Sequence, residues 1–113
     1  MAATTLPLNS FKTRPVELTT TDSVIYATPT GLTAIILGAQ VSNVGVLPAR
    51  ITFTLRKNNI DYVMLKEFIV PPNDAAEATT GKLVVEEGCS IRAFASANST
   101  LNLVLSLLET SNE

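Results

Sequence analysis

The chain has 113 residues, of which 46% are hydrophobic and 16% charged, and its formal net charge is −2. Because it has no histidine, it can build no Ser-His-Asp or Cys-His catalytic site and no histidine-containing zinc site. Because it has one cysteine, it can form no internal disulfide. A mildly acidic chain of one-domain length without a basic tract is also a poor nucleic-acid binder.

The first third of the chain predicts an arm followed by two strands. Residues 1–22 contain Pro7 and Pro15 and have no apolar periodicity, which predicts an extended N-terminal arm in which residues 16–18 could form a short strand. Residues 23–28 are rich in β-branched and aromatic side chains and predict a strand, followed by a Pro-Thr-Gly turn. Residues 33–44 predict a long strand covered on both sides, and Gly38 within it predicts a bulge, a bend or a close backbone approach.

The middle of the chain predicts a β-hairpin and a loop. Residues 49–57 alternate between apolar and polar side chains, which is typical of a strand with one buried face. Asn58-Asn59 predicts a tight turn, because asparagine tolerates the left-handed backbone region. Residues 61–70 form the partner strand and end at Pro71-Pro72, and residues 75–78 are expected to make one helical turn.

The last third predicts three further strands, at residues 82–86, 89–96 and 100–108, the last with four leucines on one face. About seven or eight short strands, with turns near every ten residues, indicate an all-β fold, an antiparallel β-sandwich or jelly roll. A small barrel is the alternative. The predicted organisation is an N-terminal arm (1–22), a β-sandwich domain (23–110) and a polar tail (111–113).

The sequence contains no arrangement that predicts chemistry. Glu86 and Glu87 are adjacent and would point to opposite faces of a strand, while Asp74 and Glu77 fall on a loop without a calcium-binding pattern. We therefore expect no enzyme, and no catalytic, cofactor-binding or metal-binding residues. No signal peptide or membrane-spanning segment is expected either, and Cys89 is interpreted as a small buried hydrophobic residue.

Surplus apolar strand surface is the more informative feature. Val104 and Leu108 lie on the face of the last strand opposite its leucines, so a small sandwich cannot bury both sides alone. A subunit interface would bury them, unless loops and the arm cover them instead. Arg50 and Arg56 lie on the polar face of one strand and either pair with nearby acids or contact an acidic partner. Leu6, Leu8 and Phe11 are candidate anchors by which the arm docks on a neighbour.

Two segments carry a resemblance to a known family. These are Val24-Ile25-Tyr26 with Pro29-Thr30-Gly31-Leu32 and the long strand containing Asn43, and Pro71-Pro72 followed by Gly81-Lys82-Leu83-Val84-Val85-Glu86-Glu87-Gly88. Over roughly residues 15–110 the chain resembles small β-sandwich virion structural proteins of tailed phages, many of them from marine and cyanobacterial hosts.

The resemblance implies a non-enzymatic protein of the virion, assembled in the bacterial host cytoplasm. It favours a head decoration (cement) protein that binds the major capsid protein or another virion protein as a homo-oligomer, a trimer being expected. A tail, neck or fibre-associated adaptor is the alternative within the particle. A host-surface or carbohydrate-binding module is the alternative outside that role, although the aromatic residues fall in predicted strands or the arm rather than on loops.

Overall fold

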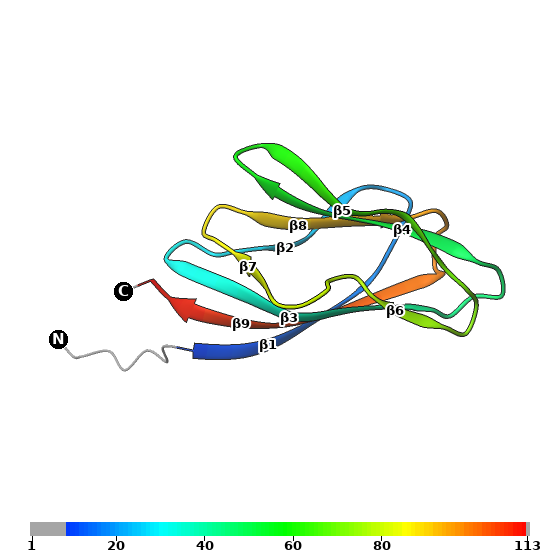
Figure 1. Ribbon diagram of the computed structural model, residues 1–113, viewed down its shortest axis with the longest axis horizontal. Coiled ribbons are helices and arrows are strands. Elements are labelled where there is room, and N and C mark those ends of the chain that lie inside the picture. Colours follow the sequence, from blue (N-terminus) through cyan, green and yellow to red (C-terminus); the bar gives the residue numbers. More distant parts are fainter. Residues whose placement is uncertain (1–8, 113) are drawn as a thin grey trace.

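Alternation of inward-facing and outward-facing side chains gives nine strands in the computed structural model, which describes residues 9–112 (Figure 1). The strands are β1 (Asn9–Glu17), β2 (Ser23–Ala27), β3 (Leu32–Asn43), β4 (Ala49–Lys57), β5 (Ile60–Val70), β6 (Ala75–Glu77), β7 (Leu83–Val85), β8 (Ser90–Ala95) and β9 (Leu101–Ser111). Among the described residues there is no helix, and hence none that could cross a membrane.

Two antiparallel sheets pack face to face as a sandwich. Sheet one has the order β1-β9-β3-β6, with β7 also paired to β3, and sheet two has the order β2-β8-β4-β5. Because β6 and β7 pair with different parts of β3, they are two pieces of one interrupted strand. Each sheet then has four strands, with the chain passing between them as in a jelly roll. The predicted fold class is confirmed.

The core lies between the two sheets and is made of the inward-facing residues of both. Sheet one contributes the four leucines of β9, as the alternation predicts, and sheet two contributes Ile51 and Phe53 of β4 with Ile91 of β8. Cys89 is 5% exposed and belongs to this core, as expected from the sequence.

The predicted turns and the predicted irregularity of β3 are present. Asn58 and Asn59 have φ angles of 55° and 63°, the left-handed pair that a two-residue hairpin requires. The pairing of β3 with β9 shifts register between Ile36 and Gly38, which is the bulge that Gly38 predicts. A side chain there would be crowded, since a Cβ on Gly38 would lie 3.2 Å from a carboxylate oxygen of Glu77.

Three segments differ from the sequence prediction. Residues 9–17, expected within the arm, form β1, which tolerates Pro15 because it is an edge strand paired only with β9. Residues 75–77 are a strand and not a helical turn, because pairing with β3 satisfies their backbone groups. β9 continues to Ser111, since its last residues pair with Leu32, Thr33 and Ala34 of β3.

Candidate assembly surfaces

An apolar row crosses the outer side of sheet one. Phe11 of β1 lies opposite Leu108 of β9, Leu108 lies opposite Ile35 of β3, and Ile35 lies opposite Val84 of β7. Directly opposed residues share one face of a sheet and lie close enough for contact, so the four side chains form a continuous ridge. The ridge is open to solvent: Phe11 is 74% exposed and Val84 is 55% exposed.

A second, shorter ridge runs parallel to the first. Pro15 lies opposite Val104, which lies opposite Gln40. Between the two ridges the register places Thr13, Ser106 and Gly38, and the bulge in β3 adds Leu37, which is 39% exposed. The outer side of sheet one is therefore corrugated, with a shallow valley between two apolar ridges. We call this surface the neutral face; it consists of Phe11, Thr13, Pro15, Ile35, Gly38, Val84, Val104, Ser106 and Leu108.

Charge is nearly excluded from the neutral face. The basic residues of β1 turn the other way: Lys12 pairs with Glu109 at 3.0 Å, and Arg14 Nε donates a hydrogen bond to the carbonyl of Ile25. The outward positions of β1, β3 and β9 carry Glu17 as their single charged residue among residues 9–112. Glu77 of β6 lies opposite Gln40 on the same outer side. Its carboxylate accepts a hydrogen bond from the Ala39 N–H and lies next to Gly38, so it is a second charge at the β6 margin of the face. Exposed Lys82 directly precedes β7.

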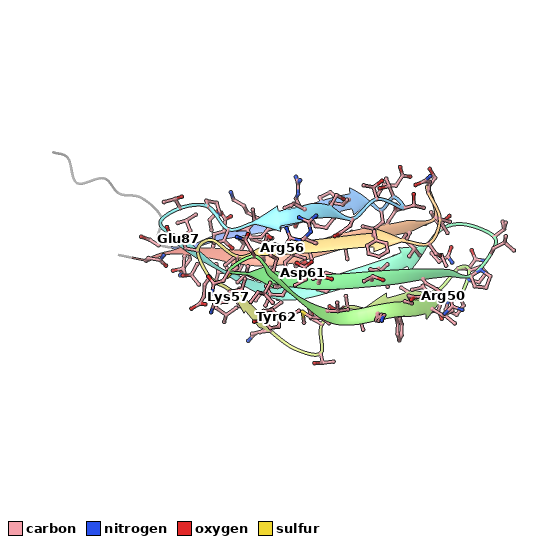
Figure 2. The ribbon with its side chains drawn as sticks, turned by 90° about the horizontal axis from the view of Figure 1, so that it is seen from above. Arg50, Arg56, Lys57, Asp61, Tyr62 and Glu87 are labelled. Carbon is pink, nitrogen blue, oxygen red and sulfur yellow. The ribbon has the colours of Figure 1, made fainter. Side chains whose placement is uncertain are left out.

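The second apolar surface is β5, which with β2 is one of the two edge strands of sheet two. Figure 2 shows the green β4–β5 hairpin, with Arg56, Lys57, Asp61 and Tyr62 near its tip. Large apolar side chains are exposed on both sides of the strand, because β6 and β7 opposite it are only three residues each. We call them the β5 surface: Ile60, Tyr62, Val63, Met64, Phe68 and Ile69.

The backbone of β5 is interrupted twice. Its register against β4 shifts between Ile51 and Phe53 and again between Phe53 and Thr54. Glu67 has a φ of 51°, and its N–H donates to the hydroxyl of Thr52 at 3.3 Å rather than continuing the ladder. Bulges of this kind twist an edge strand and discourage pairing with a further strand. β5 therefore offers its side chains, and not a regular backbone edge, to a neighbour.

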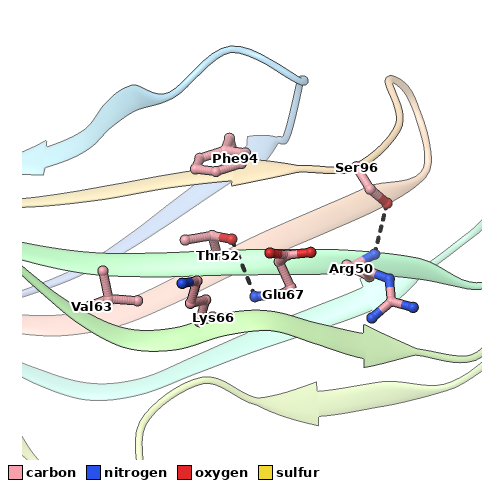
Figure 3. Close-up of a pocket in the computed structure, with 7 residues that line it drawn as sticks. All are labelled: Arg50, Thr52, Val63, Lys66, Glu67, Phe94 and Ser96. Atoms are coloured by element: carbon pink, nitrogen blue, oxygen red, sulfur yellow. Dashed lines mark hydrogen bonds between the residues drawn. The ribbon is translucent and has the colours of Figure 1, made fainter.

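A hollow of about 270 Å³ lies next to β5 on the outer side of sheet two (Figure 3). Phe94 and Val63 contribute apolar surface to it, while Arg50, Lys66 and Glu67 bring charge. Neither the guanidinium of Arg50 nor the ammonium of Lys66 has an acidic partner among residues 9–112. The hollow therefore carries two uncompensated cations beside one carboxylate.

The predicted partner-binding residues fall into three groups. The structure brings Phe11, Val104 and Leu108 together on the neutral face, while Arg50 lies at the hollow beside β5. Arg56 pairs with Asp61 at 2.6 Å, which is one of its two expected roles. The pair raises the pKa of the guanidinium and lowers the pKa of the Asp61 carboxyl. Leu6 and Leu8 lie outside the described residues.

Sequence reasoning missed an apolar loop at one end of the sandwich. The β3–β4 loop exposes Val44, Val46 and Leu47, with Val46 88% exposed. In Figure 1 this loop lies at the end of the sandwich opposite the start of β1 and the end of β9. The uncharged run of residues 44–48 was the available signal, because turn residues are usually polar. Its exposure depends on how neighbouring loops fold, which the local sequence does not specify.

A buried carboxylate ties the two sheets together at their β1–β2 side. Glu109 of β9 is 5% exposed, accepts a hydrogen bond of 2.5 Å from the hydroxyl of Tyr26 of β2, and pairs with Lys12. Burial acts to raise the pKa of Glu109, but the bonds from Tyr26 and Lys12 outweigh it and leave that pKa below its ordinary value. Burial and the bond to Glu109 raise the pKa of Tyr26.

Residues 9–112 contain no cluster of three or more His, Cys, Asp or Glu side chains that could hold a metal ion. The carboxylates described above lie at separate places, where they form ion pairs, face solvent or, in Glu77, accept a backbone hydrogen bond from Ala39. Glu109 has an organised environment, and its partners lie on strands of both sheets. This arrangement suits a structural tie between the sheets.

Comparison with known proteins supports the fold. No protein-family model and no curated protein matches the chain. Among solved structures, it is similar to a chain from Bacillus endospore appendages, described as a novel family of disulfide-linked pili. The TM-score is 0.58 and the identity 12%, over 93% of this chain and 88% of that chain. A pentameric capsid protein isolated from metagenomic phage sequences aligns at a TM-score of 0.45 and 16% identity, over 87% of this chain and 61% of that chain. At 12% identity the likeness to the appendage chain concerns the fold alone.

Proposed function

We propose that this chain is a non-enzymatic structural protein of a virion, which assembles through exposed apolar strand surfaces. The neutral face is the observation that carries the proposal. Soluble monomers rarely expose a broad, nearly uncharged apolar surface, whereas the centres of protein interfaces are depleted of charge. The resemblance to small phage virion proteins over residues 15–110 supports a place for the protein in a phage particle.

Within the particle we propose a head decoration protein, which binds the capsid as a homo-oligomer with the trimer as the expected form. A decoration protein makes the same contact many times over a lattice, so each contact can be weak while the whole layer stays bound. Broad apolar strand surfaces suit this mode of attachment. The alternative place is the tail, the neck or a fibre, where the protein would act as an adaptor.

Electron microscopy of particles with and without the protein tests this proposal. We expect density for the protein on the head, and a lower temperature of head disruption for particles that lack it. Density at the tail or neck would support the adaptor instead. Particles of unchanged composition and unchanged heat resistance would contradict a virion role.

The docking role of the N-terminal residues remains a proposal that the same particles can test. Deleting residues 1–8 leaves β1 complete, because that strand begins at Asn9. We expect the shortened protein to keep its thermal unfolding midpoint and to occupy fewer sites on the particle. Unchanged occupancy would show that Leu6 and Leu8 are not anchors. Deleting residues 1–14 is a poorer test, because it also removes most of β1 from sheet one.

A further inference from the structure

The molecule carries two different apolar surfaces at different places on the sandwich. The neutral face is the broad outer side of sheet one, and the β5 surface is one free edge of sheet two. The two surfaces also differ in shape. The neutral face has a valley between two ridges, whereas β5 is an edge with apolar side chains on both of its sides. An edge of this form can pack into such a valley.

Charge favours the same pairing. Glu17 and Glu77 have no cationic partner among residues 9–112, although the Glu77 carboxylate accepts a hydrogen bond from the Ala39 N–H, and with Lys82 they give the region of the neutral face a net charge of −1. Arg50, Lys66 and Glu67 give the region beside β5 a net charge of +1. Two β5 surfaces brought together would place unpaired cations near each other, while the neutral face offers them acids. Complementary potentials of this kind select a partner and fix its orientation.

The neutral face supplies about half of the area that a stable contact needs. Four strands about 4.8 Å apart and five residues long at about 3.3 Å per residue (Phe11 to Pro15 on β1) cover roughly 19 Å by 16 Å, on the order of 300 Å², and the contact must extend over the adjoining outward residues of sheet one. Specific interfaces bury roughly 600–1,000 Å² on each partner. Pairing of strand edges would use less of this area, and the bulges of β5 discourage it.

We infer that the neutral face of one copy receives the β5 surface of a second copy, in a head-to-tail contact repeated from copy to copy. This inference rests on the proposed assembly function and names its partner surface. A head-to-tail contact leaves one surface free at each end, so it continues until a ring closes or a filament forms. A broad face and an edge point in different directions rather than back to back, so successive copies are rotated relative to one another.

Two charge-introducing variants test the contact by mixing. Phe11→Glu blocks the neutral face and leaves β5 intact, while Tyr62→Glu blocks β5 and leaves the neutral face intact. Tyr62 is 53% exposed, so both changes fall on accessible side chains. Sedimentation velocity of the purified proteins should show an oligomer for the unaltered chain and monomers for each variant alone. The mixture should form a one-to-one complex, because one intact face and one intact β5 surface remain.

Val46→Glu is the matched control, since it introduces the same charge at an exposed apolar residue outside both surfaces. It should assemble like the unaltered protein. All variants should keep the thermal unfolding midpoint to within a few degrees; if Tyr62→Glu does not fold, Ile69→Glu on the same strand replaces it.

Other results overturn the inference in recognisable ways. Tyr62→Glu that still self-associates points to a face-to-face contact, and Phe11→Glu that still self-associates points to contact between β5 strands. A protein that stays monomeric at about 100 μM but decorates particles contradicts the head-to-tail contact and leaves the virion role standing. A protein that assembles as inferred but is absent from particles supports the head-to-tail contact and contradicts the virion role.

Discussion

The outer sides of the two sheets differ in the number of charged side chains that they carry. On sheet two, ion pairs join Arg56 to Asp61 and Arg92 to Asp22, and further charges surround the hollow beside β5. On sheet one, Lys12 and Arg14 of the edge strand turn inward, toward Glu109 and the backbone of Ile25. Strands of the same fold therefore present one charged and one nearly neutral side.

This contrast separates the requirements of folding from those of association. Both sheets contribute fully buried side chains to the core, so folding does not require their outer sides to differ. A charged outer side resists nonspecific association, whereas a neutral apolar side lowers the cost of burial against another protein. The neutral face is therefore the surface whose composition folding alone does not explain.

The largest expected effect distinguishes the two sides of one strand. Leu107→Ala removes a fully buried side chain of β9 and should lower the free energy of unfolding by about 2–5 kcal/mol. Leu108→Ala, on the next residue, removes part of the outer ridge and should cost about 1 kcal/mol or less in the monomer, while weakening association. Urea unfolding at low protein concentration measures both. Equal losses would mean that Leu108 belongs to the core.

The next effect concerns the tie between the sheets. Glu109→Gln should lower the free energy of unfolding at pH 7 by about 1–3 kcal/mol, because Lys12 loses its partner and Tyr26 loses a charged acceptor. The pKa of Glu109 in the folded state lies below its ordinary 4.5, so its stabilisation is complete above pH 4.5 and is lost as the pH falls through the folded-state value. The variant should therefore show a shallower loss of stability in acid.

Tyr26 determines how the stabilisation by the Tyr26–Glu109 hydrogen bond changes at alkaline pH. Its pKa is raised above the ordinary 10.0, so its contribution is complete below pH 10 and is lost as the pH rises through the folded-state value. Tyr26→Phe should remove this alkaline dependence. Identical pH profiles for the variants and the unaltered chain would exclude the cluster as a stabilising tie.

A smaller effect is expected from placing charge on the neutral face. Thr13→Lys adds a cation in the valley between the ridges and should weaken association about tenfold, since burying an unpaired charge is costly. Ser90→Lys adds the same charge to the outer side of sheet two and should leave association unchanged. Analytical ultracentrifugation over a concentration series gives both constants. Equal weakening by the two changes would mean that net charge, and not the face, controls assembly.

The smallest effect should come from the ion pairs of sheet two. Arg56→Ala removes the pair with Asp61 on an exposed part of the hairpin, where water and salt screen the attraction. The thermal midpoint should change little at low salt and not at all at high salt. A large drop in the thermal midpoint would show that the Arg56–Asp61 ion pair is needed to stabilise the β4–β5 hairpin.

Local signals in the sequence predict most of the strands. The turn residues Gly31, Asn58 and Asn59 fix where chain direction reverses, and alternation within β4, β8 and β9 fixes which side chains face inward. β1 and β6 were missed for a shared reason. Their sequences are polar or contain proline and alanine, and their backbone groups find partners only on strands distant in the sequence.

The neutral face could be predicted only in part. Alternation along β9 places Val104 and Leu108 on its outer side, but cross-strand register is a long-range property that one sequence does not reveal. Phe11 meets Leu108 because β1 pairs with the far end of the chain, and Val84 joins the ridge through a strand of three residues. The apolar residues of β5 fall on both faces of the strand, and their exposure follows from how short the strands opposite it are.

Burial of Cys89 has a consequence for how an assembly of this protein would persist. It is the single cysteine of the chain and its side chain lies in the core, so copies cannot be joined by a disulfide without opening the fold. Any oligomer is then held by non-covalent contacts alone. Bound subunits of such an oligomer exchange with free subunits in solution, and the oligomer dissociates as the protein is diluted. Reducing agents do not change its size.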